Sequence, residues 1–297
     1  MSKRTWALLA ATIVSIIYGV TFTIAKDVMP KYVQPFGFIT LRVGGSMLLF
    51  WLITPFFSTE KIEKQDFPRI IAAAFFGVAL NMLTFFKGLS YTSPIMGAVL
   101  MVTTPMIVLV LSAILMKERM QNRKIYGLIL GLIGTIFLII YGKSVINASN
   151  ATLGNILVFI NAVSYGFYLI IVKKLMDKYN AFAFVKWIYT FGFLMVLPFG
   201  WSEFQAVDFT NIPVDIFWKI GFVVVFSTFL TYLLNLVSMR ELKPTTVAVF
   251  IYLQPLFATI FAVSLGKDDV TWVKIISAVL IFTGVYLVTQ KKSFQSQ

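Results

Sequence analysis

The chain is a succession of long apolar segments separated by short charged stretches, and this pattern constrains its fold more than any other feature. A helix needs about 20 mainly apolar residues to cross the hydrocarbon core of a bilayer. Runs such as 70–86 and 125–140 lack the alternation typical of a membrane β-barrel. We therefore predict an all-α membrane protein with ten transmembrane helices, at roughly 5–25, 35–57, 68–88, 93–116, 123–141, 152–172, 181–201, 214–238, 244–265 and 270–288.

Composition indicates the same class. Of the 297 residues, 59% are hydrophobic and 12% are charged, whereas a soluble domain has about 45–50% apolar and about 25% charged residues. The chain therefore holds too little charge to cover a water-facing surface, and it is too apolar for a disordered protein. It contains no cysteine, which excludes a secreted disulfide scaffold. The first segment lacks a small-residue cleavage site, so we expect it to stay in the mature protein.

Basic residues are concentrated in every second loop, and cytoplasmic loops of membrane proteins carry an excess of lysine and arginine. One set of loops and ends holds most of the 25 basic residues: Lys3, Arg4, Lys61, Lys64, Arg69, Lys117, Arg119, Arg123, Lys124, Lys173, Lys174, Lys178, Arg240, Lys243, Lys291 and Lys292. We predict that this set and both termini are cytoplasmic. The net charge of +13 is then mainly a topological signal rather than a sign of a nucleic-acid partner.

The chain contains an internal repeat. Shifting it by 150 residues places Pro94 on Pro244 and Pro105 on Pro255 without a gap. The same shift pairs Ala98 with Ala248, Val99 with Val249, Lys117 with Lys267, Lys124 with Lys274, Ile125 with Ile275 and Gly134 with Gly284. Chance similarity between apolar helices is the alternative, but paired prolines in an ungapped stretch favour a repeat. We predict two halves of five helices each, residues 1–142 and 143–297.

An odd number of spans in each half gives the second half the opposite orientation. The charges agree, since Lys117-Glu118-Arg119 corresponds to Lys267-Asp268-Asp269, where acid replaces arginine on the predicted outer side. Inverted repeats are a recurring plan of secondary transporters, which bind their substrate near the membrane midplane. We therefore predict alternating access through a central cavity between the repeats. A channel is the rival interpretation, because some channels share such repeats.

A stretch in each half resembles a known transporter signature. The sequence GLSYTSPIMGAVLMVTTP at 88–105, which runs on to Lys117-Glu118-Arg119, resembles that of the drug/metabolite transporter superfamily, and in particular its ten-helix EamA-type members. The sequence KPTTVAVFIYLQP at 243–255 is a similar second copy, and the glycine-rich span 127–134 fits the helix after the signature. The second copy departs at Gly266, which is followed by Lys267 rather than glutamate, in a loop.

The resemblance covers essentially the whole chain and implies the ten-helix fold with two repeats. It implies transport but says little about the substrate. Proteins that resemble this one carry amino acids, drugs, nucleotide sugars or small metabolites, and many bacterial ones are exporters.

Two prolines lie within predicted helices. Pro105 and Pro255 each remove one helical hydrogen bond, which leaves the carbonyls of Met101 and Ile251 without their usual partners. Such groups are tolerated in a membrane only where protein or a water-filled cavity satisfies them. We expect bends that line the central cavity, with Thr103, Thr104 and Gln254 beside them. A packing kink satisfied by neighbouring helices is the alternative.

Basic residues inside predicted helices are candidates for anion binding. Arg42 lies seven residues into the second span, about 10 Å along the helix, and an arginine there is able to grip a carboxylate or phosphate. Lys186 lies near the equivalent position of the seventh span, where it is predicted to face the opposite mouth of the same path. Lys87 lies at an outer helix end. The alternative for Arg42 is that its side chain extends back to the lipid headgroups, and for Lys87 this is the favoured interpretation.

Four spans carry polar residues on one face. These are Ser15 and Tyr18; Asn81, Thr84 and Phe85; Asn161, Ser164, Tyr165 and Tyr168; and Thr228, Thr231, Tyr232 and Asn235. Some will bond across helices, each contributing about 1 kcal/mol or less. The others are expected to line a cavity suited to a zwitterionic or aromatic solute. The binding residues predicted from these faces are Tyr18, Asn81, Phe85, Asn161, Tyr165, Thr231 and Tyr232.

The residues needed for several other functions are absent. There is no histidine or cysteine, and all 12 acidic residues lie in loops or at predicted span ends. We therefore predict no enzyme activity, no cofactor, no metal site and no carboxylate relay for protons. No glycine-rich nucleotide loop is present, which disfavours transport driven by ATP.

These observations predict a carrier of small organic solutes, amino acids or related metabolites with a carboxylate or other anionic group, that exports them across the inner membrane of a prokaryote. The alternative is a facilitative channel or exchanger for phosphorylated or nucleotide-sugar metabolites.

Overall fold

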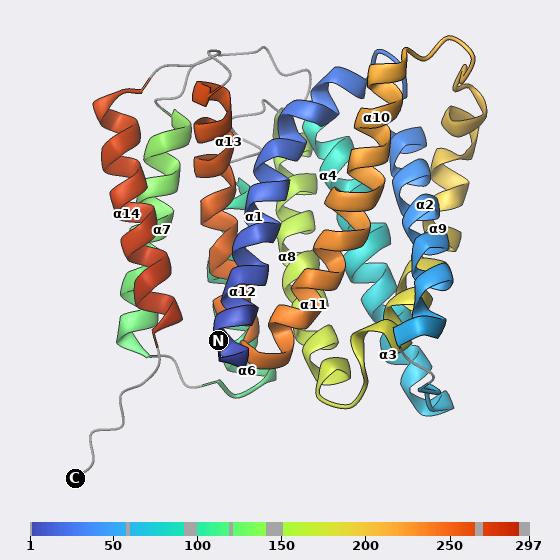
Figure 1. Cartoon of the computed structure of the whole chain (residues 1–297). Coiled ribbons are helices and arrows are strands. Elements are labelled where there is room, and N and C mark those ends of the chain that lie inside the picture. The colour runs from blue at the N-terminus through green and yellow to red at the C-terminus, as the bar shows by residue number, and fades with distance from the viewer. Residues whose placement is uncertain are drawn as a thin grey trace.

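The computed structural model describes residues 2–57, 60–91, 100–118, 121–140, 151–264 and 270–290. Every regular element in these ranges is helical, and the helices form one bundle (Figure 1). They are α1 (Lys3–Val28), α2 (Pro35–Phe57), η1 (Lys64–Asp66), α3 (Phe67–Ala74), η2 (Phe75–Ala79), α4 (Leu80–Tyr91), α6 (Thr104–Leu115), α7 (Asn122–Ile140), α8 (Ala151–Met176), α9 (Ala181–Gln205), α10 (Val214–Phe222), η3 (Val223–Leu230), α11 (Thr231–Glu241), α12 (Pro244–Ala248), η4 (Val249–Tyr252), α13 (Leu253–Ser264) and α14 (Trp272–Thr289). The predicted all-α class is confirmed.

The helices account for the predicted spans. Within the described residues, nine helical stretches are long and apolar enough to cross a membrane, and a shorter apolar helix, Thr104–Leu115, accompanies them. The short one belongs to the fourth predicted span, whose first part at 93–99 lies outside the described residues. A chain with so many apolar helices is an integral, multi-pass membrane protein.

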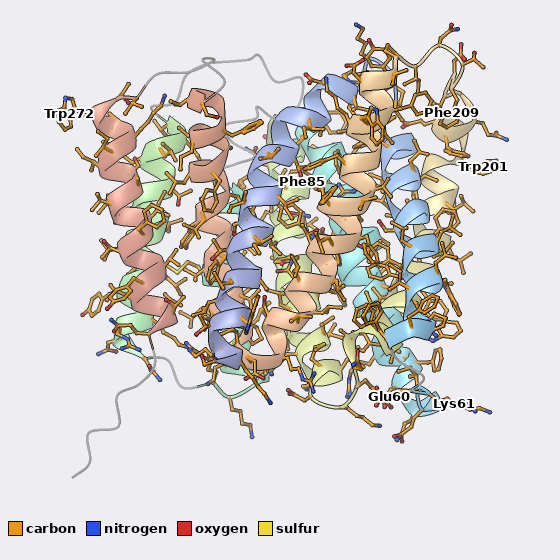
Figure 2. The ribbon with its side chains drawn as sticks, viewed as in Figure 1. Glu60, Lys61, Phe85, Trp201, Phe209 and Trp272 are labelled. Atoms are coloured by element: carbon orange, nitrogen blue, oxygen red, sulfur yellow. The ribbon has the colours of Figure 1, made fainter. Side chains whose placement is uncertain are left out.

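The outer surface of the bundle is apolar, as expected of helices that face lipid. Trp272 is 79% exposed and Phe56 is 85% exposed. Figure 2 shows Trp201 and Trp272 projecting from opposite edges of the bundle. Lipid contact therefore explains large exposed side chains that would be anomalous on a soluble protein.

Two helix pairs form the edges of the bundle. Helix α7 packs along α14 at one edge and α2 packs along α9 at the other (Figure 1). The start of α1 and the end of α14 lie at the same end of the molecule, because the Arg4 guanidinium donates to the Thr289 carbonyl. Arg123 at the start of α7 donates to the Gln290 carbonyl at 2.7 Å there as well.

Four spans are interrupted. The third contains the π-helix η2 between α3 and α4, and the eighth contains the π-helix η3 between α10 and α11. The ninth contains the 3-10 helix η4 between α12 and α13, and the fourth is broken at residues 102–103 before α6. The interrupted spans are third with eighth and fourth with ninth, which are partners in the predicted repeat. Such interruptions are frequent at functional sites.

The two prolines relate differently to these interruptions. Pro105 lies in the first turn of α6, so the helix is already broken before it and its missing N–H costs no helical hydrogen bond. The Met101 carbonyl, predicted to lack its usual partner, accepts a hydrogen bond from the Thr104 hydroxyl at 2.6 Å. Pro255 lies inside α13, just after η4. Pro244 occupies the first turn of α12.

The edge pair α7–α14 is held by direct backbone contact. A Cβ atom added to Gly127 would lie 2.8 Å from the Gly284 carbonyl oxygen, and one added to Gly134 would lie 3.0 Å from the Ser277 carbonyl oxygen. Gly127 and Ser277 are 150 residues apart in sequence, and so are Gly134 and Gly284. The two contacts are therefore made by corresponding positions of the two predicted halves.

Candidate binding site in the bundle interior

Arg42 is a buried cation on α2. The residue is 8% exposed, and its Nε donates a hydrogen bond to the Thr228 hydroxyl at 3.0 Å. Among the described residues, Thr228 is its sole hydrogen-bond partner and no carboxylate lies within ion-pair distance. Burying a charge is costly unless an opposite charge or several hydrogen bonds compensate it. Arg42 therefore makes the bundle interior attractive to an anion.

The π-helix η3 holds this arginine in place. Thr228, which is fully buried, donates to the Val223 carbonyl five residues earlier at 2.8 Å. Ser46 lies one turn after Arg42 on α2 and donates to the next carbonyl, that of Val224, at 3.1 Å. The wide turn of the π-helix thus supplies acceptors for two hydroxyls, and α2 is fixed against the eighth span at Arg42 and at Ser46.

Five tyrosines in the bundle interior form a group that we call the tyrosine cluster. They are Tyr18 on α1, Tyr165 and Tyr168 on α8, Tyr189 on α9 and Tyr232 on α11. The ring centroids of Tyr165 and Tyr168 are 5.9 Å apart, those of Tyr168 and Tyr232 are 6.0 Å apart, and those of Tyr189 and Tyr232 are 5.1 Å apart. The Arg42 charge acts on Tyr18, Tyr189 and Tyr232. Four spans thus contribute tyrosines to this part of the interior, and three of these tyrosines lie within range of the Arg42 charge.

The cluster is also tied to the other π-helix. The Tyr232 hydroxyl donates to the Gly77 carbonyl in η2 at 2.7 Å, and Ser164 donates to the neighbouring Phe76 carbonyl at 2.6 Å. The Tyr168 ring packs so closely on Gly77 that a Cβ atom there would overlap the ring. Each π-helix therefore receives hydroxyl donors from the other half of the chain, Ser46 for η3 and Ser164 and Tyr232 for η2.

Asn81 and Asn161 form a reciprocal pair between α4 and α8. Asn161 Nδ2 donates to the Asn81 carbonyl at 2.7 Å, and Asn81 Nδ2 donates to the Asn161 carbonyl at 3.4 Å. This bonding is the interhelical role that the sequence left open as an alternative. Asn161 Oδ1 and the Tyr168 hydroxyl are buried and have no hydrogen-bond partner among the described residues. These two atoms remain able to bond a ligand.

The structure brings Arg42, Tyr18, Tyr165, Thr231 and Tyr232 together. Thr231 Oγ1 lies 3.3 Å from the Tyr18 hydroxyl and donates to the Ser227 carbonyl at 2.7 Å. These residues come from the first, second, sixth and eighth spans, so the site draws on both predicted halves.

The other predicted residues have different surroundings. Thr103 and Thr104 bond the backbone of their own helix, at Leu100 and Met101. Phe85, labelled in Figure 2, is half-buried, and its ring centroid lies 5.3 Å from that of Phe86. Gln254 is half-buried on α13. Lys186 Nζ lies 4.7 Å from the ring centroid of Trp51, a residue 39% exposed on the outer side of the α2–α9 pair. Lys186 is therefore not brought to the tyrosine cluster.

Tyr189 and Ser46 were missed by the sequence interpretation. An isolated tyrosine in an apolar helix has no pattern that distinguishes it from core packing. Ser46, by contrast, follows Arg42 by four residues, a spacing that places both on one helix face. That signal was sufficient to find Ser46.

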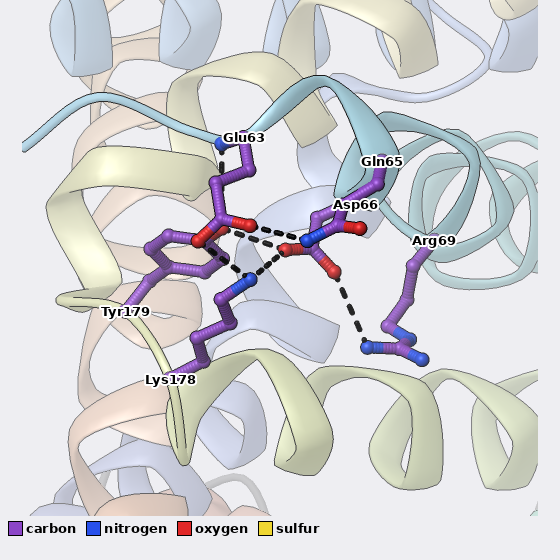
Figure 3. Close-up of polar contacts among 6 residues, drawn as sticks. All are labelled: Glu63, Gln65, Asp66, Arg69, Lys178 and Tyr179. Carbon is purple, nitrogen blue, oxygen red and sulfur yellow. Dashed lines mark hydrogen bonds and ion pairs between the residues drawn. The ribbon is translucent and has the colours of Figure 1, made fainter.

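A second polar cluster lies at the end of the bundle where α2 ends and α9 begins (Figure 3). Lys178 Nζ lies 2.6 Å from Asp66 Oδ2 and 2.9 Å from Glu63 Oε1, and the Tyr179 hydroxyl donates to Asp66 Oδ2 at 2.6 Å. Arg69 Nη1 lies 3.4 Å from Asp66 Oδ1. We call this group the end network.

The charges of the end network stabilise one another. Lys178 lowers the pKa of Glu63 below its usual value by hydrogen bonding, and Gln65 contributes to the same shift. Hydrogen bonds to Asp66, first, and to Glu63 raise the pKa of Lys178 above its usual value. Both groups are therefore held in their charged forms.

Comparison with known proteins places the chain among transporters. The model of the EamA-like transporter family matches it twice, at residues 5–140 and 152–290. The uncharacterized transporter YyaM of Bacillus subtilis is 24% identical over 275 residues, which cover 91% of this chain and 89% of the relative. An uncharacterized transporter of Archaeoglobus fulgidus is 25% identical over 289 residues, which cover 97% of this chain and 100% of the relative. A protein crystal structure shares the fold, with a TM-score of 0.77 at 15% identity over 96% of this chain and 97% of that chain.

Proposed function

Because the chain belongs to the EamA-like transporter family, we propose that it is a secondary transporter that carries small organic solutes by alternating access. The moving parts are the two inverted halves, residues 1–142 and 143–297, and the solute binds between them. The substrates are amino acids or related metabolites with a carboxylate, and the direction is export. The family model's two matches support the division into halves.

Paired contacts support the inverted arrangement. Glu203, near the end of α9, accepts hydrogen bonds from the backbone N–H groups of Phe36 and Gly37 at the start of α2, at 2.6 Å and 2.9 Å. Glu60, after the end of α2, accepts one from the N–H of Asn180 at the start of α9, at 2.8 Å. The start of each helix thus contacts a glutamate near the end of the other, so the two helices run antiparallel, as a two-fold axis in the membrane plane would arrange them. The α7–α14 contacts have the same symmetry.

The observation that carries the substrate class is the buried Arg42, which has no carboxylate partner among the described residues. A guanidinium binds a carboxylate through two parallel hydrogen bonds. The tyrosine cluster adds aromatic faces and hydroxyls, and Asn161 Oδ1 adds an acceptor. This lining supports a solute with an anionic group joined to an apolar or aromatic body. Lys186 lies over Trp51, so we give it no part in this site.

The protein is proposed to lie in the cell membrane of a prokaryote with both termini in the cytoplasm. Relatives in a bacterium and an archaeon support the membrane. The basic residues at the end of the bundle where α1 begins support the sidedness, since cytoplasmic loops are rich in lysine and arginine.

Counter-flow in proteoliposomes tests the function. Vesicles containing the purified protein are loaded with one unlabelled solute, and uptake of the same labelled solute is followed for a panel of amino acids, nucleotide sugars and phosphorylated sugars. We expect saturable counter-flow of at least one carboxylated solute, and its loss in Arg42→Ala. Arg240→Ala, at an exposed arginine, is the matched control and should transport normally. Uptake that does not saturate would indicate a channel. Counter-flow of phosphorylated solutes alone would indicate the alternative function, an exchanger for phosphorylated or nucleotide-sugar metabolites.

A further inference from the structure

The hydroxyl of Thr228 can act toward Arg42 only as an acceptor. A threonine hydroxyl has one proton, and in Thr228 the Val223 carbonyl receives it at 2.8 Å. The lone pairs of the same oxygen then face the Arg42 Nε–H at 3.0 Å. Both groups are buried, Thr228 completely and Arg42 at 8% exposure. The guanidinium is thus held by its Nε, in one orientation.

The π-helix is what makes this arrangement available. In an α-helix, the threonine hydroxyl would bond the carbonyl four residues earlier, which is that of Val224. In η3 that carbonyl instead accepts the Ser46 hydroxyl at 3.1 Å. The extra residue of the π-turn therefore gives Thr228 and Ser46 separate acceptors, and Arg42 and Ser46 are both seated on η3.

The remaining donors of Arg42 define what it can bind. A guanidinium has five N–H groups, and Thr228 occupies the one on Nε. The four on the two terminal nitrogens have no partner among the described residues. Two parallel bonds from this edge match the two oxygens of a carboxylate.

Charge limits the choice of anion. The site provides one positive charge, which one carboxylate neutralises. A phosphate ester carries nearly two negative charges above a pH of about 6, and the second would stay uncompensated in the membrane interior. Two other cations of the predicted spans are placed elsewhere: Lys186 lies 4.7 Å from the Trp51 ring centroid, and Lys87 lies 5.0 Å from that of Tyr91.

We propose that Thr228 is a positioning residue that fixes the terminal edge of Arg42 for one carboxylate and so makes the site select monoanions over phosphate dianions. The proposal rests on the binding role of Arg42 in the proposed function, and it adds a residue and a selectivity. Thr228 acts on the solute only through Arg42.

The test is a binding measurement, which does not require transport. The purified full chain is titrated with phenylacetate, phenylacetamide and phenyl phosphate at a pH well above 6, and ligand-dependent thermal stabilisation gives the three affinities. These probes share an aromatic body and differ in charge. For the unmodified protein we expect phenylacetate to bind at least about 10-fold more tightly than either of the other two, as hydrogen bonds to a charged group allow.

Three variants separate positioning from general structure. Thr228→Val removes the acceptor at constant shape and should weaken phenylacetate binding about 10-fold. The affinity for phenylacetamide should not change, and the ratio of the affinities for phenylacetate and phenyl phosphate should therefore fall. Thr228→Ser keeps the hydroxyl and should restore both affinity and selectivity. Thr135→Val is the matched control, since Thr135 is equally buried and, within the described part of the chain, its hydroxyl bonds only the Gly131 carbonyl of its own helix.

The outcomes are distinct from those of the transport experiment. Two results with Thr228→Val would overturn the proposal: equal weakening of the binding of all three probes, or an unchanged affinity for phenylacetate. Two results with the unmodified protein would also overturn it: phenyl phosphate binding as tightly as phenylacetate, or no binding of phenylacetate. If counter-flow is observed although one of these binding results is obtained, the proposed transporter function still holds. Selective phenylacetate binding without counter-flow of any solute would instead overturn the proposed function alone.

Discussion

The interior site and the end network differ in whether their positive charge has an acidic partner. At the end of the bundle, Lys178 meets both Asp66 and Glu63, and the Asp66 carboxylate also accepts from Tyr179. In the interior, Arg42 meets one neutral hydroxyl. The desolvated charge is the one left without an acid among the described residues, which is the reverse of what stability alone favours.

Under the proposed function, the difference is one between a charge that stabilises the fold and a charge that binds the solute. A cation that only holds the fold is best paired, and a second group shows this: Lys124, 7% exposed, lies 2.5 Å from Glu118, which also accepts from Thr245 at 3.2 Å. A cation kept for a solute must stay unpaired until the solute arrives. The comparison therefore predicts that removing Arg42 affects transport and removing an end-network charge affects stability.

The largest effect is expected from Arg42→Met, which removes the charge and keeps much of the side-chain volume. Counter-flow of a carboxylated solute should fall about 100-fold, equivalent to about 2.7 kcal/mol, which is within the range for a hydrogen-bonded charge pair. The thermal unfolding midpoint should stay the same or rise, because an uncompensated buried charge is replaced by an apolar side chain. Transport in proteoliposomes and unfolding in detergent measure the two quantities.

Lys178→Met is the control for this comparison, because it removes a cation that does have acids beside it. It should lower the unfolding midpoint while counter-flow per folded protein stays within about two-fold. If Arg42→Met lowered stability as Lys178→Met does, Arg42 would be a structural charge and the contrast between the two regions would be lost.

A smaller effect is expected from Asp66→Asn in the end network. The amide keeps the shape but removes the charge that both Lys178 and Arg69 face. The unfolding midpoint should fall by a few degrees, with the solute's KM unchanged. Asp177→Asn is the control, since that carboxylate is 59% exposed and pairs with Lys173 within its own helix end, where such pairs contribute little. An equal fall in both variants would mean that the end network is an ordinary surface pair.

The all-helical fold could be predicted from the sequence because a bilayer makes length and apolarity decisive. Ten apolar segments predicted ten spans, and the described helices fall on them, nine of them long enough to cross a membrane and one, Thr104–Leu115, shorter. The positions of η2 and η3 could not be predicted in the same way. A π-turn arises when the inter-helix contacts of a particular turn stabilise one extra residue, and those contacts, such as Ser46 with Val224, exist only in three dimensions.

Part of the candidate site could be predicted from the sequence for the same reason. Arg42 was identified because a charge in an apolar run is rare, and Tyr18, Tyr165, Thr231 and Tyr232 because they lie on polar faces. Lys186 satisfied the same criteria, yet it lies against Trp51 on the outer side of α9. The sequence gives the depth of a side chain in the membrane, but the direction in which it points depends on how the helix is rotated against its neighbours.

Tyr232→Phe and Tyr168→Phe sharpen the comparison within the interior. The Tyr232 hydroxyl donates to the Gly77 carbonyl at 2.7 Å, whereas that of Tyr168 is buried with no partner among the described residues. Losing the first bond should lower the free energy of unfolding by about 1 kcal/mol, and losing the second hydroxyl should leave it unchanged or raise it. Denaturant unfolding of both variants measures the difference. The reverse order would show that Tyr168, rather than Tyr232, contributes a structural hydrogen bond.

The smallest effect concerns the pH dependence of the end network. The pKa of Glu63 is lowered by Lys178, so its contribution to stability is complete above the usual pKa of about 4.3 and is lost as pH falls through the lower folded value. The pKa of Lys178 is raised, mainly by Asp66, so its contribution is complete below about 10.4 and is lost as pH rises through the folded value. The difference in unfolding midpoint between the unmodified protein and Lys178→Met should therefore form a plateau from about pH 5 to about pH 10 and shrink on both sides. The same difference for Arg42→Met should not shrink at acid or at alkaline pH. A guanidinium stays charged over the whole range, and this one faces no titrating acid among the described residues. A difference in unfolding midpoint that changes at acid pH for Arg42→Met would mean that a carboxylate does reach Arg42 and that the interior charge is paired after all.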